Sequence, residues 1–231
     1  MEFVVVKLIA LETSSRWGSI ALLENGALLH QLPLQAPQRT ATTLAPGIRE
    51  CLDQVGWQGT DLEAIAVTLG PGSFTGLRLG VTTAKTLAYV WQIRLVGVNT
   101  LEVIAAQTPE DTLLVVPAID AYRQQTFTAV YERNSLGNCQ EKVPACVIED
   151  ANWPTWLPPG ATLSGSGLEK FSPEQLQAFS IANSELWQPQ ATTVGQLAHA
   201  QLLAGRQDDL WQVVPQYYRQ SAAEEKRNQA E

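Results

Sequence analysis

The chain has 231 residues, 45% of them apolar, which predicts a globular protein with a substantial buried core rather than a disordered chain. Its 15 basic and 23 acidic residues give a net charge of −8, and the basic residues form no cluster. We therefore expect that the chain does not itself bind nucleic acid or an anionic membrane. Three cysteines without a C-x-x-C pair, no secretory pattern and no long uninterrupted apolar stretch predict free thiols, no membrane span and a cytoplasmic location.

Residues 1–108 are predicted to form a first lobe that begins with strands and then alternates strands with helices. Apolar, β-branched runs predict strands over residues 3–11, 17–23, 27–34, 62–69 and 94–98. Apolar residues at helical spacing predict helices over residues 40–55 and from Gly70-Pro71-Gly72 to about Trp91, and Thr100 is expected to cap a further helix. Antiparallel hairpins followed by parallel strands with crossover helices predict an α/β fold.

Residues 109–221 repeat this opening more loosely and predict a second, reduced lobe. Strands are expected over residues 112–119, 126–131, 141–149 and 161–164, and helices near residues 173–179 and 194–204. The final part of this lobe is a candidate for returning to the first lobe, and residues 222–231 are expected to form a charged tail. The expected fold is therefore two α/β lobes, each a mixed sheet with flanking helices.

A polar turn, Glu12-Thr13-Ser14-Ser15, follows the first strand. Hydroxyl-rich turns of this kind can cradle phosphate with backbone N–H groups, and a carboxylate there can hold magnesium through water. The alternative is a plain hairpin turn, and the local sequence leaves both explanations open.

The most informative segment is LGPGSFTGLRLG, Leu69–Gly80, in which a buried strand passes through two glycines into a helix. This arrangement points unpaired N–H groups and the positive end of a helix at an anion. The spacing matches neither a Walker P-loop nor a dinucleotide fingerprint. The candidate nucleotide or anion contacts are therefore Glu12, Thr13, Ser14, Gly70 and Gly72, and the alternative is a purely structural tight turn.

Small residues recur every four positions along the helix that follows, at Gly72, Gly76, Gly80, Ala84 and Ala88. A glycine inside a helix costs roughly 1 kcal/mol relative to alanine, so Gly76 and Gly80 need a compensating close contact. That contact is either the protein's own sheet or a helix of a second subunit, and both explanations stay open.

Residues suited to catalysis are sparse. The histidines, His30 and His199, belong to no H-E-x-x-H or H-x-x-x-H motif, and no G-x-S-x-G elbow is present, so we expect no metal site and no catalytic residue. Asp120 and Arg123 follow a predicted strand and form a weak candidate for an active-site pair, because most such pairs are solvated turn residues.

Four stretches carry a family resemblance: KLIALETSSRWGSIALLENG, AIAVTLGPGSFTGLRLGVTTAKTLAY, LVGVNTLEVIA and PAIDAYRQQTFTAVY. They resemble the TsaB family of bacterial tRNA threonylcarbamoyladenosine (t6A) biosynthesis proteins, in the actin-like (ASKHA, RNase H-like) superfamily, over about residues 5–130. The stretch Val214-Pro-Gln-Tyr-Tyr-Arg219 resembles the closing P-x-Y-x-R segment of that family. The sequence departs from the family pattern at Glu12, where aspartate is usual, at Tyr122 and Gln125, where Arg and Glu are usual, and near Thr40–Thr43, which lacks a His-Ser-like pair.

The resemblance implies two actin-like lobes and a non-catalytic scaffold. Members of the family act with TsaD, which transfers the threonylcarbamoyl group to N6 of adenosine 37 in tRNAs reading codons that begin with A, and with the ATPase TsaE. ATP and metal would then belong to the partners, tRNA would be contacted only indirectly, and the chain alone would form a homodimer. The implied partner interface lies on the first lobe, at Gly72, Ser73, Phe74, Thr75, Gly76, Leu77, Arg78, Gly80, Val81, Ala84, Leu87 and Ala88.

Two other functions stay open. An independent actin-like ATPase or small-molecule kinase needs phosphate loops in both lobes, and Leu163–Gly167 (LSGSG) is the candidate in the second lobe. A peptidase is the third alternative, and the sequence offers no motif for its metal ligands.

Overall fold

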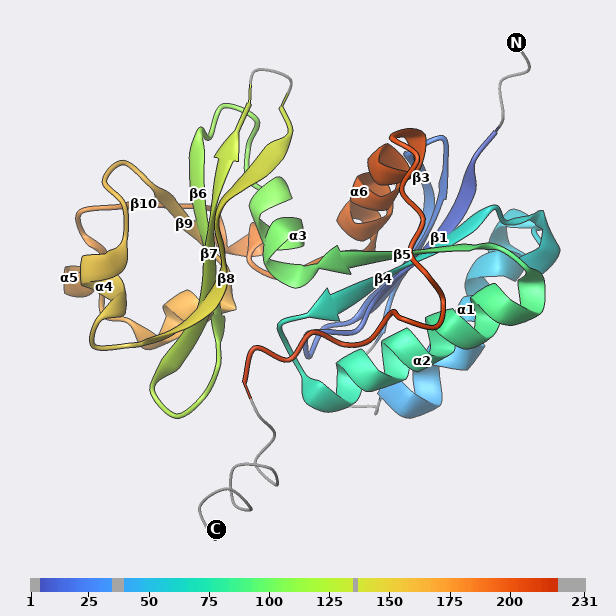
Figure 1. Cartoon of the computed structure of the whole chain (residues 1–231), viewed down its shortest axis with the longest axis horizontal. Coiled ribbons are helices and arrows are strands. Elements are labelled where there is room, and N and C mark those ends of the chain that lie inside the picture. The colour runs from blue at the N-terminus through green and yellow to red at the C-terminus, as the bar shows by residue number, and fades with distance from the viewer. Residues whose placement is uncertain (1–4, 35–39, 135–136, 220–231) are drawn as a thin grey trace, which may run out of the picture.

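The computed structural model describes residues 5–34, 40–134 and 137–219 and arranges them in two lobes that lie side by side (Figure 1). Each lobe contains a five-stranded mixed sheet, with strand orders β3-β2-β1-β4-β5 and β10-β9-β6-β7-β8. This architecture confirms the predicted α/β class with two mixed sheets. The proposed lobe limits at residues 108 and 221 stay a prediction, and the charged tail at 222–231 lies outside the described residues.

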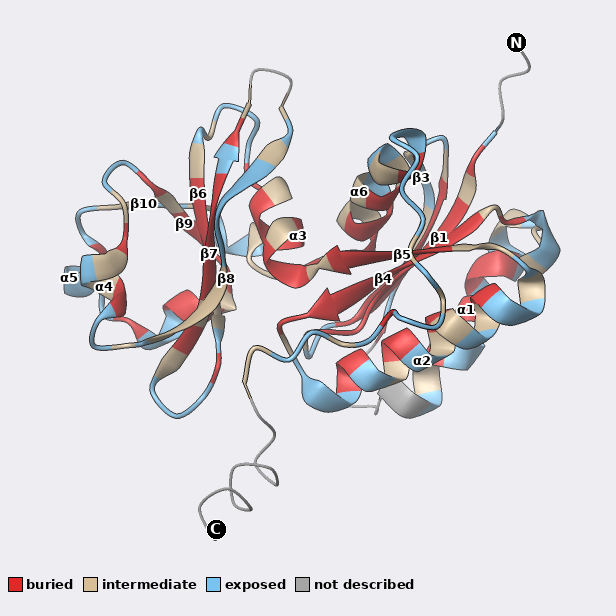
Figure 2. Cartoon of the chain, viewed as in Figure 1, coloured by how far each residue is buried: buried red, intermediate tan, exposed pale blue. Residues whose placement is uncertain are grey.

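In the first lobe, the strands occur along the chain in the order that the sequence predicts. An antiparallel meander, β1 (Lys7–Glu12), β2 (Ser19–Glu24) and β3 (Ala27–Pro33), is extended by β4 (Ala64–Gly70) and β5 (Arg94–Asn99), which run parallel to β1. The central strands β1 and β4 are almost entirely apolar because helices cover both of their faces. Figure 2 shows these strands as the most deeply buried part of the lobe.

Three helices bury this sheet. On one face lie α1 (Thr40–Val55) and α2 (Phe74–Trp91), both close to the predicted helices, and they pack on Ile9, Ile65 and neighbouring apolar side chains. The opposite face is covered by α6 (Ala191–Leu203), which comes from the end of the chain (Figure 1). The second half of the chain therefore completes the core of the first lobe.

The second sheet consists of β6 (Leu114–Asp120), β7 (Gln125–Arg133), β8 (Cys139–Glu149), β9 (Thr162–Ser164) and β10 (Ser180–Ile181). The first lobe contributes α3 (Thr100–Ala106) to one face of this sheet. Short elements cover the other face, where the Trp153 and Phe171 rings stack at 4.7 Å: α4 (Trp153–Trp156), η2 (Ser166–Lys170) and α5 (Pro173–Leu176). The expected helix over 173–179 is thus a single turn, and a short η3 (Ser184–Leu186) precedes α6.

One expected helix cap is wrong by one residue. Thr100 is the first residue of α3, and the cap is Asn99, whose side chain accepts a hydrogen bond from the Leu101 N–H at 2.8 Å. Both residue types favour caps, and Asn99 is placed to cap because it ends β5 in an extended conformation.

The chain after α6 forms an extended segment, for which the sequence offered a return to the first lobe only as a candidate. Residues 206–219, here called the strap, return along the edge of β5 and then follow α2 towards the second lobe (Figure 1). The Asp208 N–H donates to the Leu95 carbonyl at 3.1 Å, and the Gln216 N–H donates to the Leu69 carbonyl at 2.7 Å. The strap therefore covers one edge of the first sheet.

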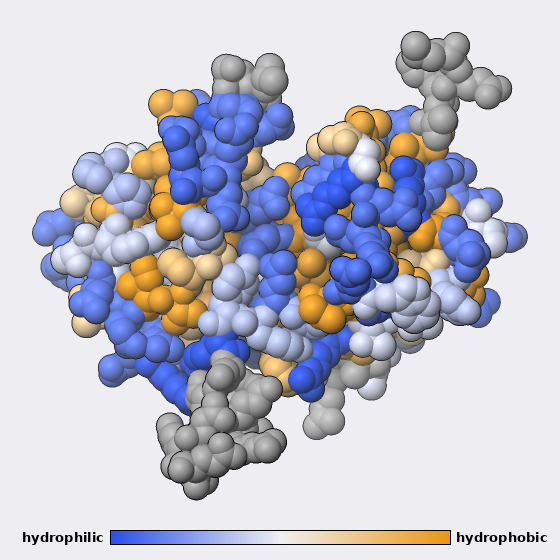
Figure 3. All heavy atoms as spheres, viewed as in Figure 1, coloured by the Kyte–Doolittle hydropathy of each residue, from blue (hydrophilic) through white to orange (hydrophobic). Residues whose placement is uncertain are grey.

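Much of the surface is polar. Figure 3 shows a mostly hydrophilic face with apolar side chains in scattered patches on both lobes. Among the helices of the described residues, none is long and apolar enough to cross a membrane.

Candidate functional site

The two predicted loops meet at a cleft between the lobes, which is lined by Ser14 and Gly72, whereas the candidates Glu12, Thr13 and Gly70 are buried and are not among its lining residues. The Glu12–Ser15 turn ends β1 and the Gly70–Ser73 loop ends β4, and because these strands are parallel neighbours their ends lie together. A cavity of about 1120 Å³ is lined by both loops, by Asp120–Tyr122 from the second lobe and by Gln216–Arg219 from the strap. The structure therefore brings together four segments that are far apart in the sequence.

The first turn is organised around its own carboxylate. Glu12 is fully buried, and its Oε1 accepts hydrogen bonds from the Ser14 N–H at 2.7 Å and from the Ser14 hydroxyl. Its Oε2 accepts from the Ser15 hydroxyl at 3.1 Å. Burial raises the pKa of Glu12 from 4.5 to about 7, although these hydrogen bonds lower it. The donors that were expected to cradle a phosphate are thus turned towards an internal carboxyl group.

The glycines of the second loop allow this turn to approach α2. A methyl group at Gly72 would lie 2.3 Å from the Ser14 carbonyl oxygen, and one at Gly76 would lie 2.0 Å from the Thr13 carbonyl oxygen. The Ser73 N–H donates to the Ser14 carbonyl at 2.7 Å, and the Ser73 hydroxyl caps α2 by accepting from the Gly76 N–H. The close contact that the glycines require is therefore with the protein's own first turn, and of the two open explanations the structure supports the internal one.

The residues proposed for a partner interface divide into two groups. Ser73, Phe74, Thr75 and Arg78 are exposed, and Gly72 and Leu87 are partly buried. The rest of the helical set is buried within the chain, so those side chains cannot themselves meet a partner: Gly76, Leu77, Gly80, Val81, Ala84 and Ala88. Contact between a partner and the exposed group stays a prediction.

The exposed side of α2 carries residues that were not predicted as interface positions. Thr82, Thr86, Tyr89 and Val90 are exposed, with 57% of Tyr89 and 64% of Val90 accessible. Together with Phe74, Thr75 and Arg78 they form what we call the α2 face. The helix contains no acidic residue. Helical phase was the available signal, because at 100° per residue Thr82, Thr86 and Tyr89 lie opposite the small-residue stripe, and Phe74 and Val90 lie at the two borders of that outer side.

The turn between β6 and β7 has an unusual backbone. Tyr122, Arg123 and Gln124 have φ angles of 57°, 54° and 60°, so three successive residues other than glycine adopt the left-handed region. Such conformations cost about 1–3 kcal/mol each and persist where neighbouring contacts enforce them. The turn leaves 75% of Tyr122 exposed beside the cleft.

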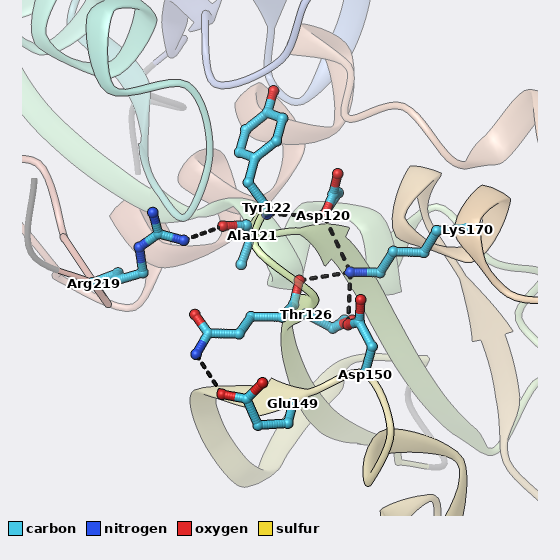
Figure 4. Close-up of polar contacts among 9 residues, drawn as sticks. Asp120, Ala121, Tyr122, Thr126, Glu149, Asp150, Lys170 and Arg219 are labelled. Atoms are coloured by element: carbon cyan, nitrogen blue, oxygen red, sulfur yellow. Dashed lines mark hydrogen bonds and ion pairs between the residues drawn. The ribbon is translucent and has the colours of Figure 1, made fainter. Parts of the chain in front are cut away.

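Two charged side chains from outside the turn hold it in place (Figure 4). Lys170 Nζ lies 3.1 Å from Asp120 Oδ1 and 2.8 Å from Asp150 Oδ1, and it donates to the Gln125 carbonyl at 2.6 Å. From the strap, Arg219 Nη1 donates to the Ala121 carbonyl at 2.5 Å. Asp120 was predicted as a candidate, but no local pattern indicated Lys170 or Asp150, because their proximity depends on the tertiary fold.

The second-lobe phosphate loop expected for an ATPase is packed against strand β6. A methyl group at Gly165 would lie 2.3 Å from the Ala118 carbonyl oxygen, and one at Gly167 would lie 2.9 Å from the Ile119 backbone. Both glycines thus serve close packing, and Ser166 lines the cleft. In the described part of the chain no three His, Cys, Asp or Glu residues are grouped so that they could hold a metal ion.

Several proteins with similar sequences carry names that refer to tRNA threonylcarbamoyladenosine formation. The model of the family described as TsaD, tRNA N6-adenosine threonylcarbamoyltransferase, matches residues 31–226. The tRNA threonylcarbamoyladenosine biosynthesis protein TsaB of Bacillus subtilis (strain 168) is 32% identical over 146 residues, covering 63% of this chain and 63% of the relative. TsaB of Escherichia coli (strain K12) is 31% identical over 134 residues, covering 57% and 58%. The matched segments span less than two thirds of these relatives.

Structural similarity extends over nearly the whole chain. A solved structure from Pseudomonas aeruginosa, described as an uncharacterized protein with similarity to peptidase YeaZ, superposes with a TM-score of 0.79. It covers 93% of this chain and 100% of the other, at 24% identity. This likeness concerns the fold alone, and it agrees with the predicted arrangement of two α/β lobes, each with a mixed sheet.

Proposed function

Because this chain belongs to the family described as tRNA N6-adenosine threonylcarbamoyltransferase (TsaD), and its relatives in Bacillus subtilis and Escherichia coli are named TsaB, we propose that it serves t6A formation as a TsaB-type subunit. In this role it is a non-catalytic scaffold that binds a TsaD-type subunit. That subunit transfers the threonylcarbamoyl group to N6 of adenosine 37 in tRNAs reading codons that begin with A. The chain acts in the cytoplasm and meets tRNA only through its partner.

The observation that carries the non-catalytic role is the internal use of the first turn. The Ser14 N–H and the Ser14 and Ser15 hydroxyls donate to the Glu12 carboxyl group. The backbone carbonyls of Thr13 and Ser14 are in turn packed against the glycines of α2 and its loop. A phosphate would have to displace a buried carboxyl group to use these donors. The arrangement therefore supports a structural role for motifs that bind ligands in other proteins.

The α2 face is the proposed docking surface for the TsaD-type subunit. Tyr89 and Val90 expose apolar area, and their neighbours Thr82 and Thr86 are uncharged. Interface cores are depleted in charge and enriched in aromatic residues, which fits this face. In the absence of the partner, two copies of the chain associate through the same face as a homodimer. The TsaE-type ATPase joins the assembly and, with the TsaD-type subunit, brings its own ATP and metal.

A matched pair of valine variants tests the docking surface. Val90→Glu places a charge on the α2 face, whereas Val143→Glu places one on β8 in the second lobe, where the side chain is also exposed. We expect Val90→Glu to lose co-purification with a TsaD-type subunit and to be monomeric by light scattering, while Val143→Glu behaves like the wild type. Retained binding in Val90→Glu, or equal loss in both variants, would contradict the proposed surface.

The cleft itself favours a second candidate, an independent actin-like ATPase or small-molecule kinase. Its volume of about 1120 Å³ is sufficient for a nucleotide. Calorimetry of the isolated chain with ATP and magnesium separates the two functions. The scaffold predicts no appreciable heat of binding, and tight binding by the chain alone would favour the ATPase.

A further inference from the structure

The lobes are fastened together on one side of the molecule by a compact set of hydrogen bonds. Gln107, just after α3, donates through its side-chain amide to the Leu186 carbonyl at 2.9 Å and to the Gln188 carbonyl at 2.8 Å. Its Oε1 accepts from the Gln190 N–H at 2.9 Å. Two chain segments connect the sheets, one after α3 and one before α6, and these hydrogen bonds join them to each other. We call this place the hinge side.

The strap joins the lobes at a second place, and its first contacts are with the first lobe. Lys85 Nζ of α2 donates to the Val213 carbonyl at 2.9 Å, and Val213 itself is buried in the first-lobe core. Further along, the Tyr217 ring lies 4.7 Å from the Phe74 ring, and the Tyr217 hydroxyl accepts from Arg78 Nε at 2.9 Å. The strap therefore rests on residues of the α2 face.

The last described residues of the strap then contact the second lobe. The hydroxyl of Tyr218 accepts from Asn99 Nδ2 at 2.9 Å, while its ring meets Phe127 of β7 edge-on at 6.3 Å. Arg219 extends from the strap to the Ala121 carbonyl of the β6–β7 turn (Figure 4). These contacts lie at the cleft, because Tyr218, Arg219, Ala121 and Phe127 all line it.

We infer that Tyr218 and Arg219 form an interlobe latch that positions the left-handed β6–β7 turn relative to α2. The two residues are positioning residues and take no part in chemistry. Lys170 holds the turn from within the second lobe, and Arg219 holds it from the first, so the conformation of Tyr122–Gln124 depends on the two lobes staying together. Because the same strap packs on Phe74 and Arg78, a partner bound to the α2 face is coupled through the latch to the cleft. This last step rests on the proposed function, whereas the latch itself does not.

Hydrogen exchange of the full chain tests the latch without any partner. The backbone N–H groups of Ala121 and Gln125 are protected by hydrogen bonds within the turn, to the Gln125 and Tyr122 carbonyls. We expect Arg219→Ala to accelerate the exchange of these two N–H groups about tenfold. The exchange rate of the backbone N–H of Gln107, on the hinge side, should stay unchanged. Arg219→Lys, which can still donate to the Ala121 carbonyl, should restore much of the protection. Arg49→Ala, which alters an exposed ion pair on α1, serves as the control.

The outcomes separate a latch from a general stabilising contact. Unchanged exchange of the turn in Arg219→Ala and in Tyr218→Ala would overturn the latch. Equal acceleration at Gln107 would also overturn it, because the arginine would then stabilise the whole chain. The coupling is measured separately, as weaker binding of a TsaD-type subunit by Arg219→Ala than by Arg219→Lys. If the wild type itself bound no such subunit, the proposed function would fail while the exchange result still decided the latch.

Discussion

The contact between Gly76 and the first turn makes a strong prediction about alanine at this position. Gly76 lies inside α2, where alanine is favoured over glycine by about 1 kcal/mol. On helix propensity alone, Gly76→Ala should therefore stabilise the protein. The structure predicts the opposite, because the added methyl group would lie 2.0 Å from the Thr13 carbonyl oxygen.

The size of the destabilisation depends on which atoms must move to make room for the added methyl group. The obstacle is backbone of a buried turn that is held by Glu12 and by the Ser73 N–H, so it cannot rotate away. Overpacking a rigid site costs about 1–3 kcal/mol and sometimes more. After subtraction of the propensity gain of about 1 kcal/mol, we expect a net destabilisation of about 1 kcal/mol, rising to about 2 kcal/mol if the turn does not yield.

Urea denaturation of Gly76→Ala and Gly195→Ala measures this effect with a matched control. Gly195 also lies inside a helix and is buried, but the nearest obstacle to a methyl group there is Leu23 Cδ1, the end of a flexible side chain. The control should therefore lose less stability than Gly76→Ala, because the tip of a side chain shifts more readily than a hydrogen-bonded backbone carbonyl. If Gly76→Ala were as stable as the wild type, or if both variants lost equal stability, the proposed packing of α2 on the first turn would be refuted.

Three further predictions concern the remaining buried groups. Because burial raises the pKa of Glu12 from 4.5 to about 7, its contribution to stability is complete below pH 4.5 and is lost as the pH rises through 7. Unfolding free energies of the wild type and Glu12→Gln should thus diverge by about 3 kcal/mol across this interval, and parallel curves would contradict the assignment. The Cys51 thiol, buried and with a pKa raised to about 12 by desolvation, should resist alkylation in the folded protein, and labelling as fast as that of Cys139 or Cys146 would speak against its burial. Asn99→Ala should cost at least about 1 kcal/mol of unfolding free energy, because it removes both the α3 cap and the hydrogen bond to the Tyr218 hydroxyl. Thr100→Val should be nearly neutral, since the Thr100 hydroxyl has no hydrogen-bond partner, and the reverse order would restore Thr100 as the cap.

The first lobe could be predicted largely from the sequence because its signals are local. Apolar runs marked β1 and β4, an Asn-Gly turn marked the hairpin between β2 and β3, and the amphipathic pattern of residues 40–55 matched α1 in full. The second lobe was predicted less accurately. Its short elements pack around Trp153 and depend on tertiary contacts that no periodicity reveals.

The candidate site was likewise predicted where its signals are local in the sequence and missed where they depend on tertiary contacts. The two loops of the first lobe were found, because glycines and hydroxyls near strand ends are visible in the sequence. The direction in which the small-residue stripe faces was not decided, since periodicity defines a face of a helix but not its partner. The return of the strap was mentioned only as a candidate, and Lys170 and Arg219 join the site from positions about 50 and 98 residues away from the turn residues they contact.

The central claim, that the chain serves as a docking scaffold and not as a catalyst, is tested most directly by t6A formation on tRNA in a reconstituted reaction with a TsaD-type subunit. Two variants are compared with the wild type: Glu12→Gln, which alters the cleft-side turn, and Val90→Glu, which alters the α2 face. The account predicts wild-type yield with Glu12→Gln and little or no product with Val90→Glu. Loss of product with a folded, partner-binding Glu12→Gln, together with full yield from Val90→Glu, would contradict it.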